Sequence, residues 1–293
     1  MYSKKILSLL FLLIFVQNSF AQNIRQKIDS LLKTKKADVG IAIYDLQSKD
    51  TITWGNYRKY PMQSVYKFHL ALAVLHQVDK GKLSLEQKIL VKKSDLLPNT
   101  WSPLREKYPQ GNIELPLSEI IHYTVAISDN NGCDILFRLL GGTKKVHKYI
   151  KSLGIKEIAI KATEEEMHKE WDVQFTNWTT PLATVQLLEI FHQKNILSKT
   201  SQEFLWKTMV ETSTGLKRMK YLLPKNTIIA HKTGTSDNKD GITSAINDMG
   251  IIMLPNGNYI AVCVFVSNSK EDFQTNEQII ADVTKMIWDE CTK

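Results

Sequence analysis

Three short motifs in this 293-residue chain carry side chains capable of nucleophilic chemistry: Ser64-Val65-Tyr66-Lys67, Ser128-Asp129-Asn130 and Lys232-Thr233-Gly234. A serine hydroxyl attacks a carbonyl efficiently only when a base removes its proton. A lysine that is desolvated and lies near another cation loses its proton more easily and can serve as that base. The first motif therefore predicts an activated serine nucleophile.

The position of the first motif separates it from chance matches. Ser64 opens a segment, 65–78, that is apolar almost all round and closes at Gly81, so we expect a buried helix. Ser64 and Lys67 would lie one turn apart on the same face, with Ser64 at the positive end of the helix dipole. An N-cap serine beside a snorkelling lysine would be the better interpretation if the motif stood alone. Other SxxK matches begin at Ser30, Ser236 and Ser267, and a second SDN, which we assign to a loop, begins at Ser236.

Strands near both ends of the chain and helices between them would position these motifs. Residues 22–61 and 212–293 are expected to form an α/β domain, in which N- and C-terminal helices flank one antiparallel sheet. Residues 62–211 are expected to form an inserted all-helical domain, and the cleft between the two is the natural site for chemistry. The expected strands are 38–44, 51–54, 227–233, 249–254 and 259–266, with a hairpin turn at 255–257, and the expected helices include 24–32, 65–78 and 276–288.

The first 21 residues read as a signal peptide. Lys4 and Lys5 precede an apolar run, 6–16, that is too short to span a bilayer, and Ala21 ends a cleavage-like sequence. The absence of a cysteine directly after Ala21 argues against a lipoprotein anchor. We expect an exported protein, periplasmic or secreted, although a buried N-terminal helix is the alternative.

Composition excludes several other classes of protein. The formal net charge is +8, but the lysines are scattered, so a solvated surface is a better interpretation than nucleic-acid binding. The seven histidines form no metal-binding motif. Cys133, Cys263 and Cys291 have no framework spacing, and we expect them to stay unpaired.

Together the three motifs resemble those of the penicillin-recognising serine enzymes, and their spacing is similar to that of class A β-lactamases over the whole mature chain. Further details resemble the PER- and VEB-type extended-spectrum branch: Gln63, the segment Thr100-Trp101-Ser102-Pro103, the ExxMH form at 164–168, and Asn177-Trp178-Thr179. The resemblance implies that family's fold, a small-molecule β-lactam as substrate, no cofactor or metal, and a monomer.

The resemblance also implies catalytic roles. Ser64 would attack the lactam carbonyl, and either Lys67 or Glu164 would be the acylation base. Ser128 would relay a proton to the leaving nitrogen, and Glu164 would activate the water that hydrolyses the ester. Glu164 matches the family spacing, but Glu165 and Glu166 beside it keep that choice open. The remaining expected substrate-binding residues are Trp101, Asn130, His168, Arg218, Lys232, Thr233, Gly234 and Thr235, with the backbone N–H groups of Ser64 and Thr235 as oxyanion hole.

Departures from the family pattern lie in the Ω-loop, at about 160–178. Ala162 and Asn177 replace the usual arginine–aspartate pair, and His168 replaces an asparagine that helps to hold the hydrolytic water. The loop would then be anchored by apolar residues and leave a roomier cleft. Arg218 would bind the substrate carboxylate, the alternative being an ordinary surface arginine. The expected anchors are Trp171, Phe175 and Trp178.

The sequence thus predicts hydrolysis of penicillins and cephalosporins, including oxyimino-cephalosporins, through an acyl-enzyme, giving antibiotic resistance. The alternatives are a penicillin-binding DD-peptidase and a penicillin-sensor domain, which would keep the acyl group. A hydrolase releases it.

Overall fold

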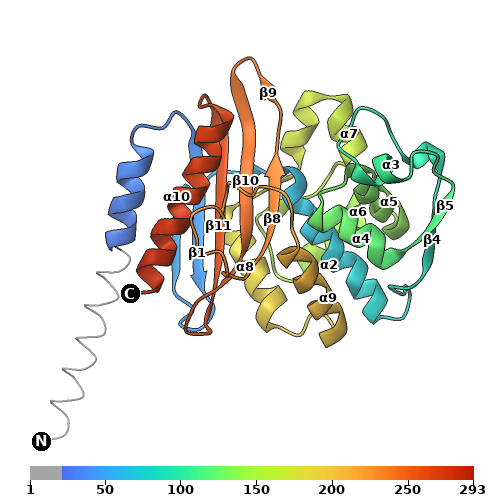
Figure 1. Ribbon diagram of the computed structural model, residues 1–293, viewed down its shortest axis with the longest axis horizontal. Helices are drawn as coiled ribbons and strands as arrows, with labels where there is room; N and C mark the ends of the chain where they lie inside the picture. The colour runs from blue at the N-terminus through green and yellow to red at the C-terminus, as the bar shows by residue number, and fades with distance from the viewer. Residues whose placement is uncertain (1–21) are drawn as a thin grey trace, which may run out of the picture.

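The computed structural model describes residues 22–293 (Figure 1). The predicted signal peptide, residues 1–21, lies outside the described residues, so its cleavage stays a prediction. Among residues 22–293, no helix combines the length and the apolar character needed to cross a membrane.

One antiparallel sheet combines strands from both ends of the chain, as predicted. The strand order is β2-β1-β11-β10-β8, and the short β9 pairs with β10. The predicted hairpin turn is present, because Gly257 has φ 84° and its N–H donates to the carbonyl of Leu254 at 2.9 Å. The strands are β1 (Asp38–Asp45), β2 (Thr51–Trp54), β8 (Ile229–Thr235), β9 (Asn238–Lys239), β10 (Ile242–Met253) and β11 (Tyr259–Ser269).

Strand β10 is longer than predicted, because its first half carries polar residues that hide the strand pattern. Asn247 and Asp248 are fully buried there. The Asn247 amide donates to the carbonyl of Pro61 at 2.8 Å, and the Asp248 carboxylate lies 2.9 Å from Nδ1 of His231. The second SDN was assigned to a loop, but Asn238 begins β9.

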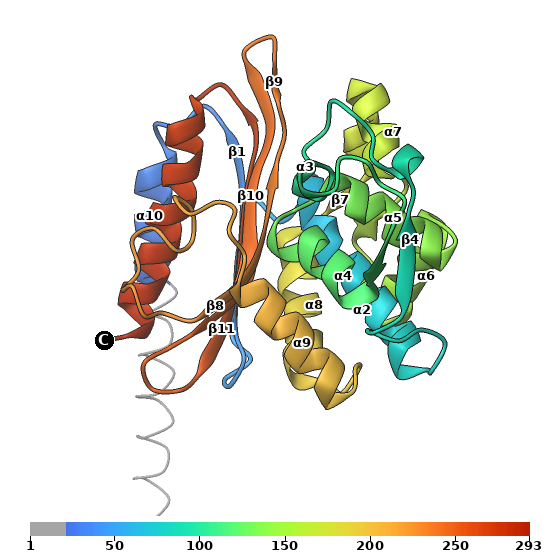
Figure 2. The ribbon, with the colours of Figure 1, turned by 45° about the vertical axis from the view of Figure 1, so that its right-hand side comes forward.

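Helices cover both faces of the sheet (Figure 2). Residues 22–32 and α10 (Phe273–Cys291) share one apolar cluster with the sheet, to which Ile24, Ile28 and Ile280 contribute. On the opposite face, α8 (Pro181–Gln193) packs against β1 and β11. The sheet lies between these two helical layers.

Helix α2 (Tyr66–Asp79) is the centre of the helical lobe. All residues from Tyr66 to Leu75 are buried, since the segment is apolar on every side, and Gly81 with φ 68° follows its end, as predicted. The surrounding helices are α3 (Pro103–Lys107), α4 (Leu117–Ala126), α5 (Asn130–Leu140), α6 (Thr143–Ser152), α7 (Glu164–Lys169) and α9 (Lys199–Val210), with 3₁₀ turns η1 (Gln63–Val65), η2 (Lys93–Asp95) and η3 (Trp171–Thr176). Short strands also occur in and beside this lobe: β3 (Tyr60–Pro61), β4 (Lys88–Val91), β5 (Ile113–Pro116), β6 (Ile158–Ala159) and β7 (Trp178–Thr179).

The helical lobe and the sheet share a hydrophobic core. One apolar cluster contains Leu70 of α2 together with Ala42 and Phe265 of the sheet. The proposed domain boundaries near residues 62 and 212 therefore mark a change of secondary structure within a continuous core. The prediction that Cys133, Cys263 and Cys291 are unpaired is confirmed.

Candidate active site

Ser64 lies in the 3₁₀ turn η1 that leads directly into α2, so its hydroxyl stands at the positive end of that helix. The preceding residue, Gln63, has φ 47°, a left-handed conformation that is unfavourable for a residue with a side chain. The Lys67 Nζ lies 2.9 Å from Ser64 Oγ, one turn along, as the spacing predicted.

The Nζ of Lys67 lies among four oxygen atoms. It is 2.9 Å from Ser64 Oγ, 2.8 Å from the Ser128 carbonyl, 2.5 Å from Asn130 Oδ1 and 3.0 Å from Glu164 Oε1. Lys67 is fully buried, and such a charge requires partners. Because an ammonium has only three hydrogens, it cannot donate to all four oxygens at once. Lys67 therefore connects Ser64 to Glu164 directly, and proton movement between these groups requires little rearrangement.

The second motif is held by the buried carboxylate of Asp129. This carboxylate accepts hydrogen bonds from the backbone N–H groups of Gly132 and Leu104, both at 2.7 Å, and from the Ser102 hydroxyl at 2.9 Å. Burial is the main cause that raises the Asp129 pKa. The neighbouring Ser128 has φ 63° and is thus held in a strained conformation by these contacts. Asp129 itself was not among the predicted site residues.

Lys232 of β8 completes the polar centre. Its fully buried Nζ donates to Ser128 Oγ at 2.9 Å and to the Thr233 carbonyl at 3.0 Å. Burial, followed by the positive charge of Lys67, lowers the pKa of Lys232 well below its usual range. The hydroxyl of Ser128 thus lies next to a lysine whose protonated form is destabilised by burial and by the charge of Lys67.

Strand β8 lies at the edge of the sheet. The N–H of Ser236 donates to Ala245 of β10 at 2.8 Å, and because backbone groups alternate along a strand, the N–H of Thr235 points to the free edge. Gly234 allows another group to approach the backbone of β8 closely, and that group is the protein's own turn around Ser64. A Cβ on Gly234 would lie 2.5 Å from the carbonyl oxygen of Met62. Glycine at this position therefore lets β8 pack against the turn that carries Ser64.

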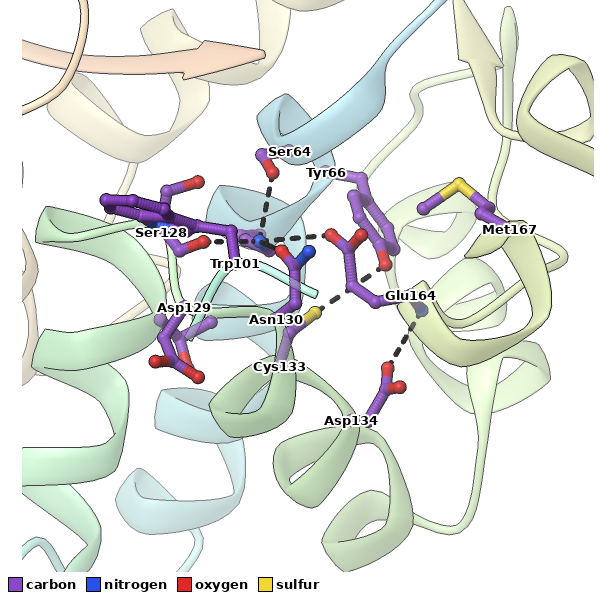
Figure 3. A network of polar contacts seen from close by, with 12 residues as sticks. Ser64, Tyr66, Trp101, Ser128, Asp129, Asn130, Cys133, Asp134, Glu164 and Met167 are labelled. Carbon is purple, nitrogen blue, oxygen red and sulfur yellow. Dashed lines mark hydrogen bonds and ion pairs between the residues drawn. The ribbon is translucent and has the colours of Figure 1, made fainter. Parts of the chain in front are cut away.

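Glu164 is the first residue of α7. Its N–H donates to the carboxylate of Asp134 at 2.8 Å (Figure 3), and the N–H of Glu165 donates to the same carboxylate at 2.8 Å. Burial, and then the charge of Glu164, raise the pKa of Asp134 to about 7. The side chain of Glu165 pairs with Lys169 at 2.7 Å, and Glu166 caps the backbone of Thr163. Of the three consecutive glutamates, only Glu164 contacts Lys67.

The Ω-loop is anchored mainly by a polar side chain and not by the apolar residues that were predicted to anchor it. Phe175 was predicted to be an apolar anchor, but 44% of its surface is exposed, and Trp171 and Trp178 are only partly buried. The fully buried Asn177 amide ties the loop instead. Its Oδ1 accepts from the N–H groups of Lys161 and Ala162 at 2.7 and 3.0 Å, and its Nδ2 donates to the Ala162 carbonyl at 2.9 Å.

The other expected binding residues differ in how they face the cleft. Trp101 is 56% exposed, and its Nε1 donates to the Ile127 carbonyl at 2.9 Å. The side chain of His168 is exposed and makes no hydrogen bond or ion pair with the residues that the structure describes. Arg218 is neither a surface residue nor a lining residue of the cleft.

The guanidinium of Arg218 is buried behind β8. It donates to Glu277 at 3.1 Å, to the carbonyls of Gly234 and Asn247 at 3.0 and 2.9 Å, and to Thr235 Oγ1 at 2.7 Å. Arg218 thus reaches the cleft through the Thr235 hydroxyl.

These elements enclose one cleft of about 730 Å³ between β8, η1, α5 and α7. It brings together Ser64, Ser128, Asn130 and Glu164 from the helical lobe with Thr233, Gly234 and Thr235 of β8. Lys67 and Lys232 lie beneath its polar floor and contact its serines. Trp101 and His168 line its rim. A serine, two lysines, a free strand edge and a carboxylate are thus arranged around one space for a small carbonyl substrate.

Comparison with known proteins identifies relatives that cover nearly the whole chain. Residues 23–291 match the β-lactamase enzyme family. β-Lactamase VEB-1 of Pseudomonas aeruginosa is 50% identical over 97% of this chain and 95% of its own length. Extended-spectrum β-lactamase PER-1 of Pseudomonas aeruginosa is 47% identical over 89% and 85%. The crystal structure of TLA-3 extended-spectrum β-lactamase superposes with a TM-score of 0.92 at 57% identity, covering 93% of this chain and all of that one. The chain therefore belongs to the β-lactamase enzyme family, as a class A enzyme that hydrolyses β-lactam antibiotics and so gives resistance to them.

Proposed function

We propose that this β-lactamase opens the lactam ring through an ester on Ser64 and that its substrates include penicillins and oxyimino-cephalosporins. The observation that carries the mechanism is the contact of Lys67 Nζ with both Ser64 Oγ, at 2.9 Å, and Glu164 Oε1, at 3.0 Å. These two contacts connect the nucleophile Ser64, the base Lys67 that can activate it, and Glu164, which can activate water.

In the acylation step, Ser64 Oγ attacks the lactam carbonyl while its proton passes to a base. Lys67 is in direct contact with the hydroxyl and with Glu164, so a neutral Lys67 amine would keep this proton, whereas a Lys67 ammonium would take it up only as it passes one of its own protons to Glu164. The backbone N–H groups of Ser64 and Thr235 stabilise the oxyanion, an arrangement that the free edge of β8 supports.

Ring opening requires a proton on the departing nitrogen. Ser128 supplies it, since its hydroxyl lies between the cleft and the buried Lys232. The lowered pKa of Lys232 allows it to replace the proton that Ser128 gives away.

In the deacylation step, Glu164 takes a proton from a water molecule, and the water oxygen bonds to the ester carbonyl. The bond from that carbon to Ser64 Oγ then breaks, and the proton returns to the serine oxygen. Asp134 supports this role by holding the first amides of α7 at 2.8 Å, which fixes the start of the helix that carries Glu164.

Substrate recognition would use the β8 edge and the cleft rim. The free strand edge at Thr233–Thr235 can pair with a substrate amide, and Asn130 can bind the acylamido side chain. We propose that Arg218 acts on the substrate carboxylate through the hydroxyl of Thr235. Trp101 and His168 would contact substrate side chains at the rim.

Acceptance of bulky oxyimino groups is supported by the 730 Å³ cleft and by its relatives' names, because PER-1 and TLA-3 are both described as extended-spectrum enzymes. Efficient hydrolysis of cefotaxime or ceftazidime beside benzylpenicillin tests this part. Negligible cefotaxime turnover with fast benzylpenicillin turnover would make the enzyme a narrow-spectrum penicillinase.

The mass of the protein during incubation with benzylpenicillin tests the mechanism as a whole. We expect a transient adduct of one substrate that disappears as substrate is consumed. A persistent adduct would instead fit a DD-peptidase or a penicillin sensor. We further propose that the enzyme is exported, works as a monomer without cofactor and has no nucleic-acid partner.

A further inference from the structure

A second cavity, of about 210 Å³, lies beside the substrate cleft. Its walls are the segment 97–100, the beginning of α5 and the helix α7. It does not include Ser64, β8 or the rim residue Trp101, so it lies away from the part of the cleft where the lactam ring would react. The residues that line both cavities are Asn99, Thr100, Asn130, Glu164 and His168.

The second cavity runs from solvent to the buried carboxylate that holds Glu164. Pro98, His168 and Lys169 at its rim are exposed, whereas Asn131 and Asp134 at its floor are buried. One water molecule occupies about 30 Å³ in the liquid, so the cavity has room for several. Polar groups on its floor give such waters hydrogen-bond partners, while Leu97 and Pro98 form an apolar wall.

Deacylation needs a supply of water at Glu164 while the main cleft is full. Each turnover consumes one water molecule, and the acyl group on Ser64 blocks the approach through the main cleft. The Glu164 side chain is only 10% exposed and lines both cavities, so it is accessible from the second one without passing the substrate.

We propose that this second cavity is a water-binding site from which the hydrolytic water reaches Glu164 in the acyl-enzyme. The inference rests on the proposed role of Glu164 as the base for deacylation. Leu97 controls the width of the passage, because its half-buried side chain is part of the cavity wall. A passage whose width is set by Leu97 would admit water more readily than larger nucleophiles.

Filling the cavity at Leu97 tests the route. The Asn131 side chain holds the N–H and the carbonyl of Leu97 at 3.2 and 3.3 Å, so the backbone should stay in place when the side chain grows. Leu97→Trp should slow deacylation by about tenfold, which corresponds to a barrier higher by about 1.4 kcal/mol, and leave acylation unchanged. Stopped-flow kinetics and adduct mass measure the two steps separately. Leu90→Trp, at a 49% exposed leucine outside both cavities, is the matched control.

Widening the cavity gives a test that a displaced helix would not mimic. Methanol, ethanol and 1-propanol compete with water for the acyl group and leave as esters of the opened lactam, with Ser64 restored. In the parent, the ester yield should fall steeply with alcohol size. Leu97→Ala should raise the yields from ethanol and propanol relative to methanol.

Parental deacylation in Leu97→Trp, or an alcohol preference that Leu97→Ala leaves unchanged, would overturn the route. The role of Glu164 is decided separately by Glu164→Gln. If that variant deacylates at the parental rate, the proposed base is wrong. If it traps the ester while the Leu97 variants behave as the parent, only the route is wrong.

Discussion

Replacement of Asn177 by alanine should destabilise the protein and trap the acyl-enzyme. The buried amide makes three hydrogen bonds to the backbone of residues 161 and 162, at 2.7, 3.0 and 2.9 Å. Alanine would leave two N–H groups and one carbonyl without partners in a site that is closed to solvent. At about 1–1.5 kcal/mol for each lost bond, the free energy of unfolding should fall by about 3–4.5 kcal/mol.

The loss should be visible in both stability and kinetics. For a chain of this size, about 2–4 °C of Tm is lost for each kcal/mol, so Tm should fall by about 6–18 °C. The amide connects the ends of the Ω-loop that carries Glu164, so deacylation should slow while acylation of Ser64 continues. Urea unfolding measures the free energy, and adduct mass under turnover measures the trapped ester.

Asn177→Asp is the matched control. Its carboxylate can accept from both N–H groups but faces the Ala162 carbonyl without a donor, so its stability should lie between those of the parent and the alanine variant. A loss below about 1 kcal/mol in Asn177→Ala would refute the assignment, because three buried bonds cannot then depend on this amide. An equal slowing of acylation and deacylation would refute the link to Glu164.

Three further predictions concern charged groups. Glu164→Gln should still acylate at Ser64 but accumulate the ester, as measured by adduct mass, and parental turnover would exclude Glu164 as the base. The Asp134 pKa of about 7 predicts that deacylation in the parent falls below about pH 7, as protonation removes an acceptor for the α7 amides, whereas Asp134→Asn should flatten this profile. Because this pKa is raised from 3.8, protonation should also stabilise the parent fold as pH falls from 7 towards 4, a dependence that urea titrations of Asp134→Asn should lack. Arg218→Ala should raise KM for β-lactams and cost about 3–5 kcal/mol of stability by leaving the buried Glu277 unpaired, and Arg218→Ala with Glu277→Ala should recover much of the stability but not KM.

The sequence predicted the elements that depend on local pattern. The spacing of Ser64 and Lys67, the apolar character of α2 and the apolar run of β11 each determine a structure within a few residues. The expectation that the three motifs meet in one cleft came from the resemblance to the penicillin-recognising serine enzymes, not from these local patterns.

The parts that the sequence analysis missed depend on contacts between distant residues. The carboxylate of Asp134 caps a helix thirty residues later, and no local pattern marks such a pairing. Arg218 was expected to bind the substrate carboxylate because its position matches an arginine of the resembled family, yet its guanidinium is buried and paired with Glu277. Phe175 was expected to anchor the Ω-loop because it is apolar, but a small polar residue, Asn177, has the buried position. Residue type alone does not tell which side of an irregular loop faces the core.

The assembly of the sheet from both ends of the chain has a consequence for the order of folding. Strand β1 pairs with β11, so that Asp38 lies opposite Ser267, and β8 with Lys232 joins through β10. Loop closure over such a distance is slow compared with local helix formation. The helices around α2 can therefore pack together early, whereas β1 can pair only after the strands near the C-terminus have been synthesised. Until then the chain has Ser64 and Lys67 but no β8 edge, so an incomplete chain cannot form the catalytic cleft. The export proposed for this chain would benefit from this delay, since the final pairing is impossible until residues 229–269 are available.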